Sequence, residues 1–140
     1  MSHPYQHAVS SAHRWGGTPE DYLPLHDWFD ASKAHVADFR HRALRHHSEG
    51  IFAAEREFGA TITNSDGRKV PTRLLGEQHV REDLGCIPTL ADWLLKIRAE
   101  PWMGHAAKLE IAHETPANVP IKRVHETRRV KIAQIPMEAQ

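Results

Sequence analysis

The chain has 140 residues, with 18 basic and 18 acidic side chains and a formal net charge of zero. This length suits one domain that buries a hydrophobic core without disulfides, and the balanced charge excludes a global field that would attract nucleic acid or an anionic membrane. The single cysteine excludes an internal disulfide and a Cys-rich zinc finger. Without a long apolar run or a signal-peptide pattern, we expect a cytoplasmic protein that does not enter membranes.

Helices are expected in the amino-terminal part. Ser2 is a suitable N-cap for a helix that extends to about Arg14. Thr-Pro-Glu-Asp over 18–21 then predicts a second helix start. Apolar spacing over 25–47 predicts further helix, followed by a bend near 48–50, because a glycine weakens a helix interior by about 1 kcal/mol relative to alanine.

A change of pattern at residue 60 predicts a β-hairpin, with strands over 60–63 and 68–74 around an Asn-Ser-Asp-Gly turn. Pro71 indicates that the second strand is an edge strand. Helices are expected again over 77–84 and 89–98, the latter with its apolar residues inward, and a weak helix over 104–111. Beyond residue 116, prolines and basic residues indicate either a loose tail or an arm that packs on a partner subunit.

The predicted fold class is therefore mainly α (α+β), a helical bundle with one inserted β-hairpin and an extended C-terminal tail. We expect a single helical, histidine-rich domain over 1–103 and a C-terminal extension or arm over 104–140.

Twelve histidines are unusual for this length, and three of them fall within seven residues of the central segment. Neighbouring side chains on a helix point about 100° apart, so one ion cannot easily use all three from a straight helix. We therefore expect a metal site that combines this segment with a second one. The predicted ligands are His41, His46, His47 and His79. Such ligands suit Zn, Fe, Ni or Mn.

Carboxylates accompany these histidines. Glu49 and Glu82 each follow a histidine at the third position, and Asp83 follows His79 at the fourth, so each pair shares a helix face. We expect these three carboxylates to act as a ligand or as the general base for metal-bound water. Lys33 and Arg45 are predicted to hold an anionic substrate, although Lys33 also fits a plain ion pair with Asp30 in solvent.

Several other signals are weaker. His3 and His7 have metal-ligand spacing, but the signal so near the terminus is weak. Cys86 is expected to be buried in packing. The Arg42 and Arg45 face and the basic tail form a patch rather than a nucleic-acid motif, so nucleic-acid binding is not favoured.

Four segments together resemble a known group: HPYQHA, DWFDASK, RHRALRHHSEGI and EQHVREDLG-x-IPTLADW. They resemble a family of small histidine-rich bacterial and phage proteins with no assigned function, over about residues 3–103. The resemblance implies only that these segments belong to one domain. The order of His13, His26-Asp27, His41, His46-His47 and Asp83 also echoes metal phosphohydrolases of the HD superfamily, although the gaps here are much shorter.

These observations favour a metal-dependent site of hydrolase type, acting on a phosphorylated or other anionic small molecule, in a protein that forms homo-oligomers. Two other classes stay open. One is a non-enzymatic bacterial or phage interaction module that oligomerises through its C-terminal arm. The other is a structural protein that responds to pH through histidine charge.

Overall fold

A computed structural model of the chain describes residues 3–104, and the chain divides into two units, Met1–Leu94 and Leu95–Gln140. The described elements of the first unit are α1 (Pro4–Trp15), α2 (Pro19–Asp30), two 3-10 helices (Ala31–Ala34 and Phe39–Leu44), α3 (Ser48–Phe58), β1 (Thr61–Thr63), β2 (Lys69–Pro71), α4 (Thr72–Leu84) and α5 (Leu90–Leu94). A third 3-10 helix, Pro101–Gly104, belongs to the second unit.

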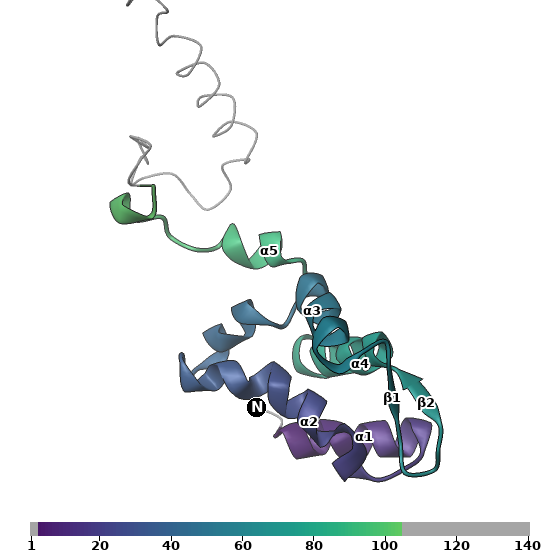
Figure 1. Cartoon of the computed structure of the whole chain (residues 1–140). Coiled ribbons are helices and arrows are strands. Elements are labelled where there is room, and N and C mark those ends of the chain that lie inside the picture. The colour runs from purple at the N-terminus through teal and green to yellow at the C-terminus, as the bar shows by residue number, and fades with distance from the viewer. Residues whose placement is uncertain (1–2, 105–140) are drawn as a thin grey trace, which may run out of the picture. The chain divides into compact units, whose positions relative to one another are not determined.

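The predicted fold class is confirmed for this part of the chain: helices dominate, and the one described sheet is a two-stranded antiparallel hairpin (Figure 1). The predicted tail, and all but the first residue of the weak helix expected over 104–111, lie outside the described residues. A domain boundary at 103/104 stays a prediction, since the first compact unit ends at Leu94. None of the described helices combines the length and the apolar character needed to cross a membrane.

The first two helices are set by their amino-terminal signals. His3, rather than the expected Ser2, is the N-cap of α1, and its Nδ1 accepts a hydrogen bond of 3.2 Å from the Tyr5 amide. The predicted restart is confirmed: α2 begins at Pro19, and the Asp21 carboxylate accepts from the Thr18 amide at 2.7 Å. Proline suits the first helical position because its missing N–H would have no partner there.

The helix predicted over 25–47 is wrong beyond Asp30. Two short 3-10 helices follow α2, and the apolar side chains that suggested an inward stripe, such as Phe39 at 62% exposure and Leu44 at 55%, lie in solvent. A sharp turn then precedes α3. It brings the Arg45 carbonyl oxygen so close to Gly50 that a Cβ at this position would lie 1.9 Å from that oxygen. Only glycine permits this close approach.

The hairpin is shorter than predicted. Thr61 pairs with Pro71 and Thr63 with Lys69, and the chain enters α4 at Thr72, five positions before the expected start at Glu77. Proline lacks the N–H that a sheet ladder needs, so pairing ends there.

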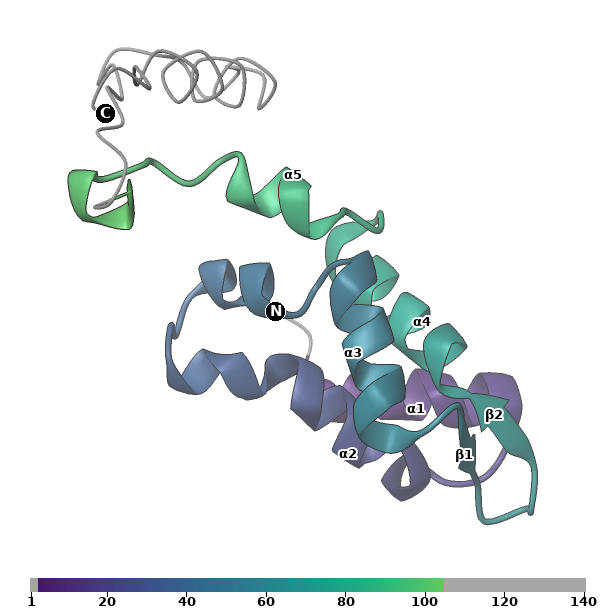
Figure 2. The same cartoon turned by 45° about the horizontal axis from the view of Figure 1, so that its top comes forward.

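The hydrophobic core lies between α1, α2, α3 and α4 (Figures 1 and 2). Its buried apolar members are Ala8, Trp15, Tyr22, Leu25, Phe29, Ile51, Ala54, Val70, Leu75 and Val80. Helix α4 comes so close to its neighbours that a Cβ on Gly76 would lie 3.2 Å from both Phe29 and Ile51.

Two further expectations are corrected at the end of the described chain. Helix α5 covers only Leu90–Leu94 of the predicted 89–98, and Leu94 and Ile97 are exposed by 53% and 51% rather than turned inward. Cys86 is exposed and not buried in packing. It follows Gly85, which ends α4 in a left-handed conformation.

Candidate metal centre

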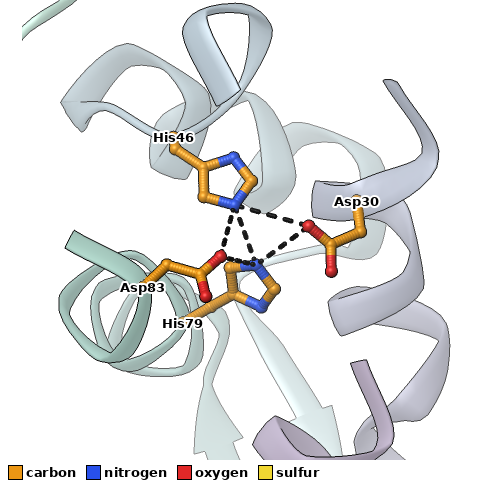
Figure 3. A group of neighbouring side chains, drawn as sticks. All are labelled: Asp30, His46, His79 and Asp83. Atoms are coloured by element: carbon orange, nitrogen blue, oxygen red, sulfur yellow. Dashed lines mark hydrogen bonds and ion pairs between the residues drawn. The ribbon is translucent and has the colours of Figure 1, made fainter. Parts of the chain in front are cut away.

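Four side chains from three segments bring one ligand atom each to a common point (Figure 3). Asp30 is the last residue of α2, His46 lies in the turn before α3, and His79 and Asp83 are one helical turn apart on α4. The four atoms lie within 4.8 Å of one another. This group could hold a metal ion.

The spacing of the four atoms agrees with a small coordination sphere. Nε2 of His46 lies 3.0 Å from Asp83 Oδ2, 3.1 Å from His79 Nε2 and 3.5 Å from Asp30 Oδ1. Nε2 of His79 lies 3.6 Å from Asp83 Oδ2 and 3.8 Å from Asp30 Oδ1. A tetrahedral ion with ligand bonds of about 2.0–2.1 Å places its ligand atoms roughly 3.3 Å apart, which is within this range.

The group is buried as well as compact. His46 and His79 have no exposed surface, Asp30 is 5% exposed, and the Asp83 side chain is 2% exposed. Oδ1 of Asp30, which faces the group, has no hydrogen-bond partner among the described residues. A buried carboxylate is costly unless a cation or hydrogen-bond donors compensate for it, so this geometry favours a positive charge at the centre.

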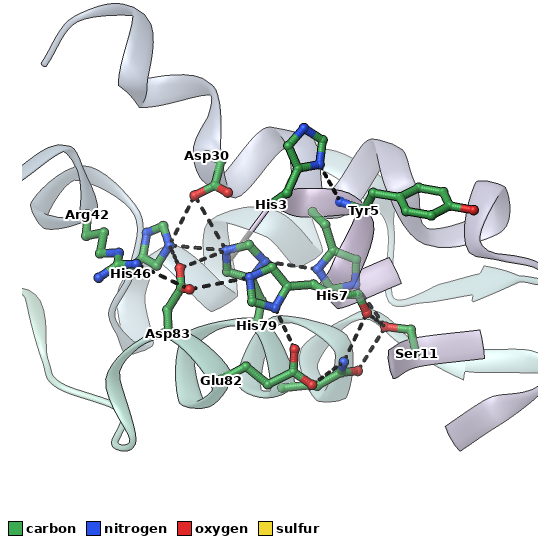
Figure 4. Close-up of polar contacts among 12 residues, drawn as sticks. His3, Tyr5, His7, Ser11, Asp30, Arg42, His46, His79, Glu82 and Asp83 are labelled. Atoms are coloured by element: carbon green, nitrogen blue, oxygen red, sulfur yellow. Dashed lines mark hydrogen bonds and ion pairs between the residues drawn. The ribbon is translucent and has the colours of Figure 1, made fainter. Parts of the chain in front are cut away.

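The outer oxygens of both carboxylates are held by cations. Lys33 Nζ lies 3.1 Å from Asp30 Oδ2, and the Arg42 guanidinium lies 3.3 Å from Asp83 Oδ1. Nε2 of His7 approaches that same Asp83 oxygen at 3.4 Å (Figure 4). Each carboxylate therefore keeps its other oxygen aimed at the centre.

These contacts set the charge of the group. Burial raises the pKa of Asp30, but the interactions with the nearby His46, His79 and Lys33 side chains outweigh it, and the pKa lies well below its usual range. For Asp83, burial is likewise outweighed, chiefly by hydrogen bonds from His46 and His7, and the pKa is lowered. Burial lowers the pKa of His79 to about 4. At neutral pH the centre therefore offers ionised carboxylates and a neutral imidazole, the forms that bind metal.

Local structure explains how the ligands reach this point. His79 and Asp83 share a face of α4 because residues four apart on a helix are neighbours. Two hydrogen bonds fix the backbone of His46. Its N–H donates to Arg42 O at 2.7 Å, and its carbonyl accepts from Trp93 Nε1 at 3.0 Å.

The predicted metal ligands separate into two pairs. His46 and His79 belong to the group. His41 is buried beside it, with Nε2 at 4.0 Å from Asp30 Oδ1 and Nδ1 at 3.0 Å from Ser32 Oγ. His47 is the N-cap of α3, and its Nδ1 accepts from the Gly50 amide at 2.9 Å.

The predicted carboxylates are likewise dispersed. Asp83 belongs to the group. Glu82 stands outside it, within 2.5 Å of His7 Nδ1 and 2.8 Å of Gln78 Nε2. Glu49 is exposed and accepts from the Leu90 amide at 2.7 Å, so it joins α3 to the first residue of α5.

The predicted substrate-binding cations also differ in place. Lys33 lies next to the centre through its ion pair with Asp30. Arg45 is engaged elsewhere: its guanidinium stacks over the Trp28 ring, 4.1 Å from the centroid, and donates to the Trp28 carbonyl.

Sequence reasoning did not identify Asp30 as a ligand, nor the buried polar side chains behind His79. A signal was present, because His26 and Asp30 have the same four-residue spacing as His79 and Asp83. The His26-Asp27 dipeptide does not enter the group, since Asp27 is exposed. His3 is exposed as a helix cap while His7 is buried, so their spacing does not make a shared site.

Comparison with known proteins gives a family but no activity. The model of a family described as "Domain of unknown function (DUF6915)" matches residues 2–103. The chain belongs to this family. All four residues of the group lie within the matched range. Neither the curated proteins nor the solved structures contain a match to the chain.

Proposed function

We propose that this member of the DUF6915 family binds one divalent transition-metal ion through Asp30, His46, His79 and Asp83 and uses it to hydrolyse a small anionic substrate. The observation that carries the proposal is the convergence of two imidazole nitrogens and two carboxylate oxygens within 4.8 Å, in a buried place. Imidazole and carboxylate together suit Zn, Fe, Ni or Mn.

The hydrolytic part follows from what such an ion does. A bound divalent ion lowers the pKa of water toward about 7 and so supplies hydroxide at neutral pH. Asp30 is the ligand suited to make room for that water. Its inner oxygen has the longest separations from the two imidazoles, 3.5 and 3.8 Å, and its outer oxygen is already paired with Lys33.

The preference for an anion follows from the charges around the group. Two carboxylates balance a divalent ion, which leaves Lys33 and Arg42 as cations at its edge. Lys33 is 31% exposed and can meet a ligand from solvent, whereas Arg42 is 13% exposed. A phosphorylated or other anionic small molecule fits this arrangement.

A structural metal site is the second candidate, and one observation favours it. All four ligand side chains are buried, and closed sites with four protein ligands are typical of structural zinc. The ion would then join the end of α2, the turn before α3, and α4. In this case metal contributes to folding rather than to a reaction.

Metal analysis of the tag-free full chain tests the shared part of both candidates. We expect one equivalent of metal per chain, lost in His46→Ala and in His79→Ala. His13→Ala is the matched control, because His13 is exposed near the end of α1. Less than stoichiometric metal that is insensitive to His46→Ala would contradict the proposal.

Turnover separates the two candidates. The metal-loaded chain is assayed against a panel of phosphomonoesters and carboxylate esters, with Lys33→Met as a variant outside the ligand set. Metal-dependent hydrolysis that weakens in Lys33→Met supports the enzyme. Stoichiometric metal without any turnover, together with a lower melting temperature after chelation, supports the structural site.

A further inference from the structure

The imidazole of His79 is supported from behind by a chain of buried hydrogen bonds. Its Nδ1 lies 3.0 Å from Nδ1 of His26, and Nε2 of His26 lies 2.8 Å from Ser11 Oγ. Ser11 Oγ lies in turn 2.9 Å from Gln78 Oε1. The first three side chains are fully buried, and Gln78 is 7% exposed. Helices α1, α2 and α4 each contribute to this chain.

The direction of the chain is set at Gln78. Its Nε2 faces two acceptors, the His7 carbonyl at 3.1 Å and Glu82 Oε1 at 2.8 Å. An amide nitrogen donates and an amide oxygen accepts, so the opposite orientation would bring three oxygens together. Oε1 of Gln78 therefore faces Ser11 as an acceptor.

The orientation of Gln78 also determines which atom donates between Ser11 and His26. Its hydroxyl has one hydrogen and two acceptors within reach, Gln78 Oε1 at 2.9 Å and the His7 carbonyl at 3.0 Å. If that hydrogen turned toward His26 instead, both oxygen–oxygen contacts would be left without a hydrogen. The Ser11 oxygen is therefore the acceptor of an N–H from His26 Nε2.

The two imidazoles complete the sequence. His26 is fully buried, and its two ring nitrogens face the Ser11 hydroxyl and the His79 ring rather than a carboxylate. A buried imidazole that has no counter-ion beside it is neutral, so this ring carries a single hydrogen, on Nε2. Its Nδ1 must then accept, and the hydrogen between the two rings belongs to His79 Nδ1. In the neutral ring, which is the form that binds a metal, Nε2 of His79 then holds a lone pair directed at Asp30, His46 and Asp83.

We infer that Ser11 and Gln78 are positioning residues that fix His79 in its Nδ1–H tautomer, through His26, and so present the Nε2 lone pair to a divalent cation. The inference rests on the proposed function, because it concerns the preparation of one ligand of that centre. Metal-bound histidines commonly donate their second N–H to an acceptor, and loss of the acceptor lowers metal affinity about 10–100-fold.

His46 provides an internal contrast. Its Nδ1 is buried and has no hydrogen-bond partner within residues 3–104, so no comparable chain fixes its tautomer. His79 is thus the ligand prepared by the fold before an ion arrives, whereas His46 shifts its hydrogen to Nδ1 on binding. In the metal-free protein, the hydrogen of His79 should therefore lie on Nδ1, whereas that of His46 should not.

The tautomers are read directly by nitrogen and carbon NMR of the metal-free full chain at pH 7, with labelled histidine and assignment from single variants. We expect His79 to carry hydrogen on Nδ1 and none on Nε2, and His26 to carry hydrogen on Nε2. A hydrogen on His79 Nε2 overturns the inference. This measurement uses no metal, so it decides the inference even if the proposed function fails.

Ser11→Ala tests the consequence for binding. Without the hydroxyl acceptor, His26 is free to move its hydrogen to Nδ1, which forces the His79 hydrogen onto Nε2. We expect the altered tautomer in the NMR spectrum and a Zn²⁺ affinity about 10–100-fold lower by competition with a chromophoric chelator. Ser10→Ala, one position earlier on α1, is the control and should leave both unchanged.

Two outcomes are kept apart by this design. Zn²⁺ that binds the Ser11→Ala chain as tightly as the wild type, with an unchanged His79 tautomer, overturns the inference. Zn²⁺ that fails to bind even the wild-type chain contradicts the proposed function, and the tautomer measurement then stands as the test of the hydrogen-bond chain. Gln78→Leu serves as a second variant should Ser11→Ala not fold.

Discussion

Two buried polar regions of this molecule differ in whether all their polar atoms have hydrogen-bond partners. At the hairpin turn, Asn64 makes four hydrogen bonds: its Nδ2 donates to Trp15 O and Tyr22 Oη at 3.2 and 3.0 Å, and its Oδ1 accepts from the amides of Asp66 and Arg68 at 3.0 and 2.9 Å. Every capacity of this amide is used. The region is complete with protein atoms alone.

The histidine and carboxylate centre is incomplete by the same measure. Among the described residues, Asp30 Oδ1, His41 Nε2 and His46 Nδ1 are buried without a hydrogen-bond partner. Buried polar atoms in folded proteins are nearly always paired, and exceptions call for an explanation such as an ion. The comparison teaches that burial of polar groups alone does not indicate a site, whereas several unpaired buried polar atoms gathered around one point do.

The largest expected effect on stability comes from Asn64 at the hairpin turn. Asn64→Ala removes four hydrogen bonds, two of them to partners in the buried residues Trp15 and Tyr22, and at about 1 kcal/mol each this lowers the free energy of unfolding by roughly 3–4 kcal/mol. Urea denaturation measures it, with exposed Thr61→Ala as the control. Because no ion takes part there, the loss should be the same with and without Zn²⁺, and a Zn²⁺-dependent loss would break the comparison.

The incomplete region should respond to metal instead. Zn²⁺ at 100 times its Kd raises the free energy of unfolding by about 2.7 kcal/mol if it binds only the folded chain. Calorimetry with and without Zn²⁺ measures this as a higher Tm. His79→Gln, which lacks one ligand, should show little shift; an equal shift in both proteins would mean that Zn²⁺ binds elsewhere.

His47 tests whether a buried histidine near the centre belongs to it. Its ring caps α3 through Gly50, so His47→Ala should cost about 1 kcal/mol, and His47→Asn, which restores a capping side chain, should recover most of it. Both variants should still take up one equivalent of Zn²⁺. Loss of Zn²⁺ in His47→Asn would show that His47 is a ligand.

The smallest effect belongs to Asp21, an accessible carboxylate beside the hairpin turn. Hydrogen bonds from the backbone amides of Thr18 and Ser65 lower its pKa. The stability that it contributes is therefore present above its unfolded pKa, about 3.9, and is lost as the pH falls through the lower folded value. The stability difference between wild type and Asp21→Asn should shrink below about pH 4. A difference that stays constant between pH 3 and 7 would argue against this.

Local patterns in the sequence were sufficient for some features. The capping signal at Thr18, the hairpin and the predominance of helix depend on residues close together in the chain, and the structure has all three. The shared helix face of His79 and Asp83 is also a local property, fixed by their four-residue separation. The sequence alone determines these features because each depends on residues that are neighbours in the chain.

Convergence was decided by tertiary structure. The sequence contains twelve histidines, and nothing local distinguishes His46, which faces the centre, from His47, which caps a helix next to it. Asp30 joins the group only because α2 ends where α4 passes. Which imidazoles and carboxylates meet depends on how helices distant in sequence pack, and that packing is a property of the whole core rather than of any segment.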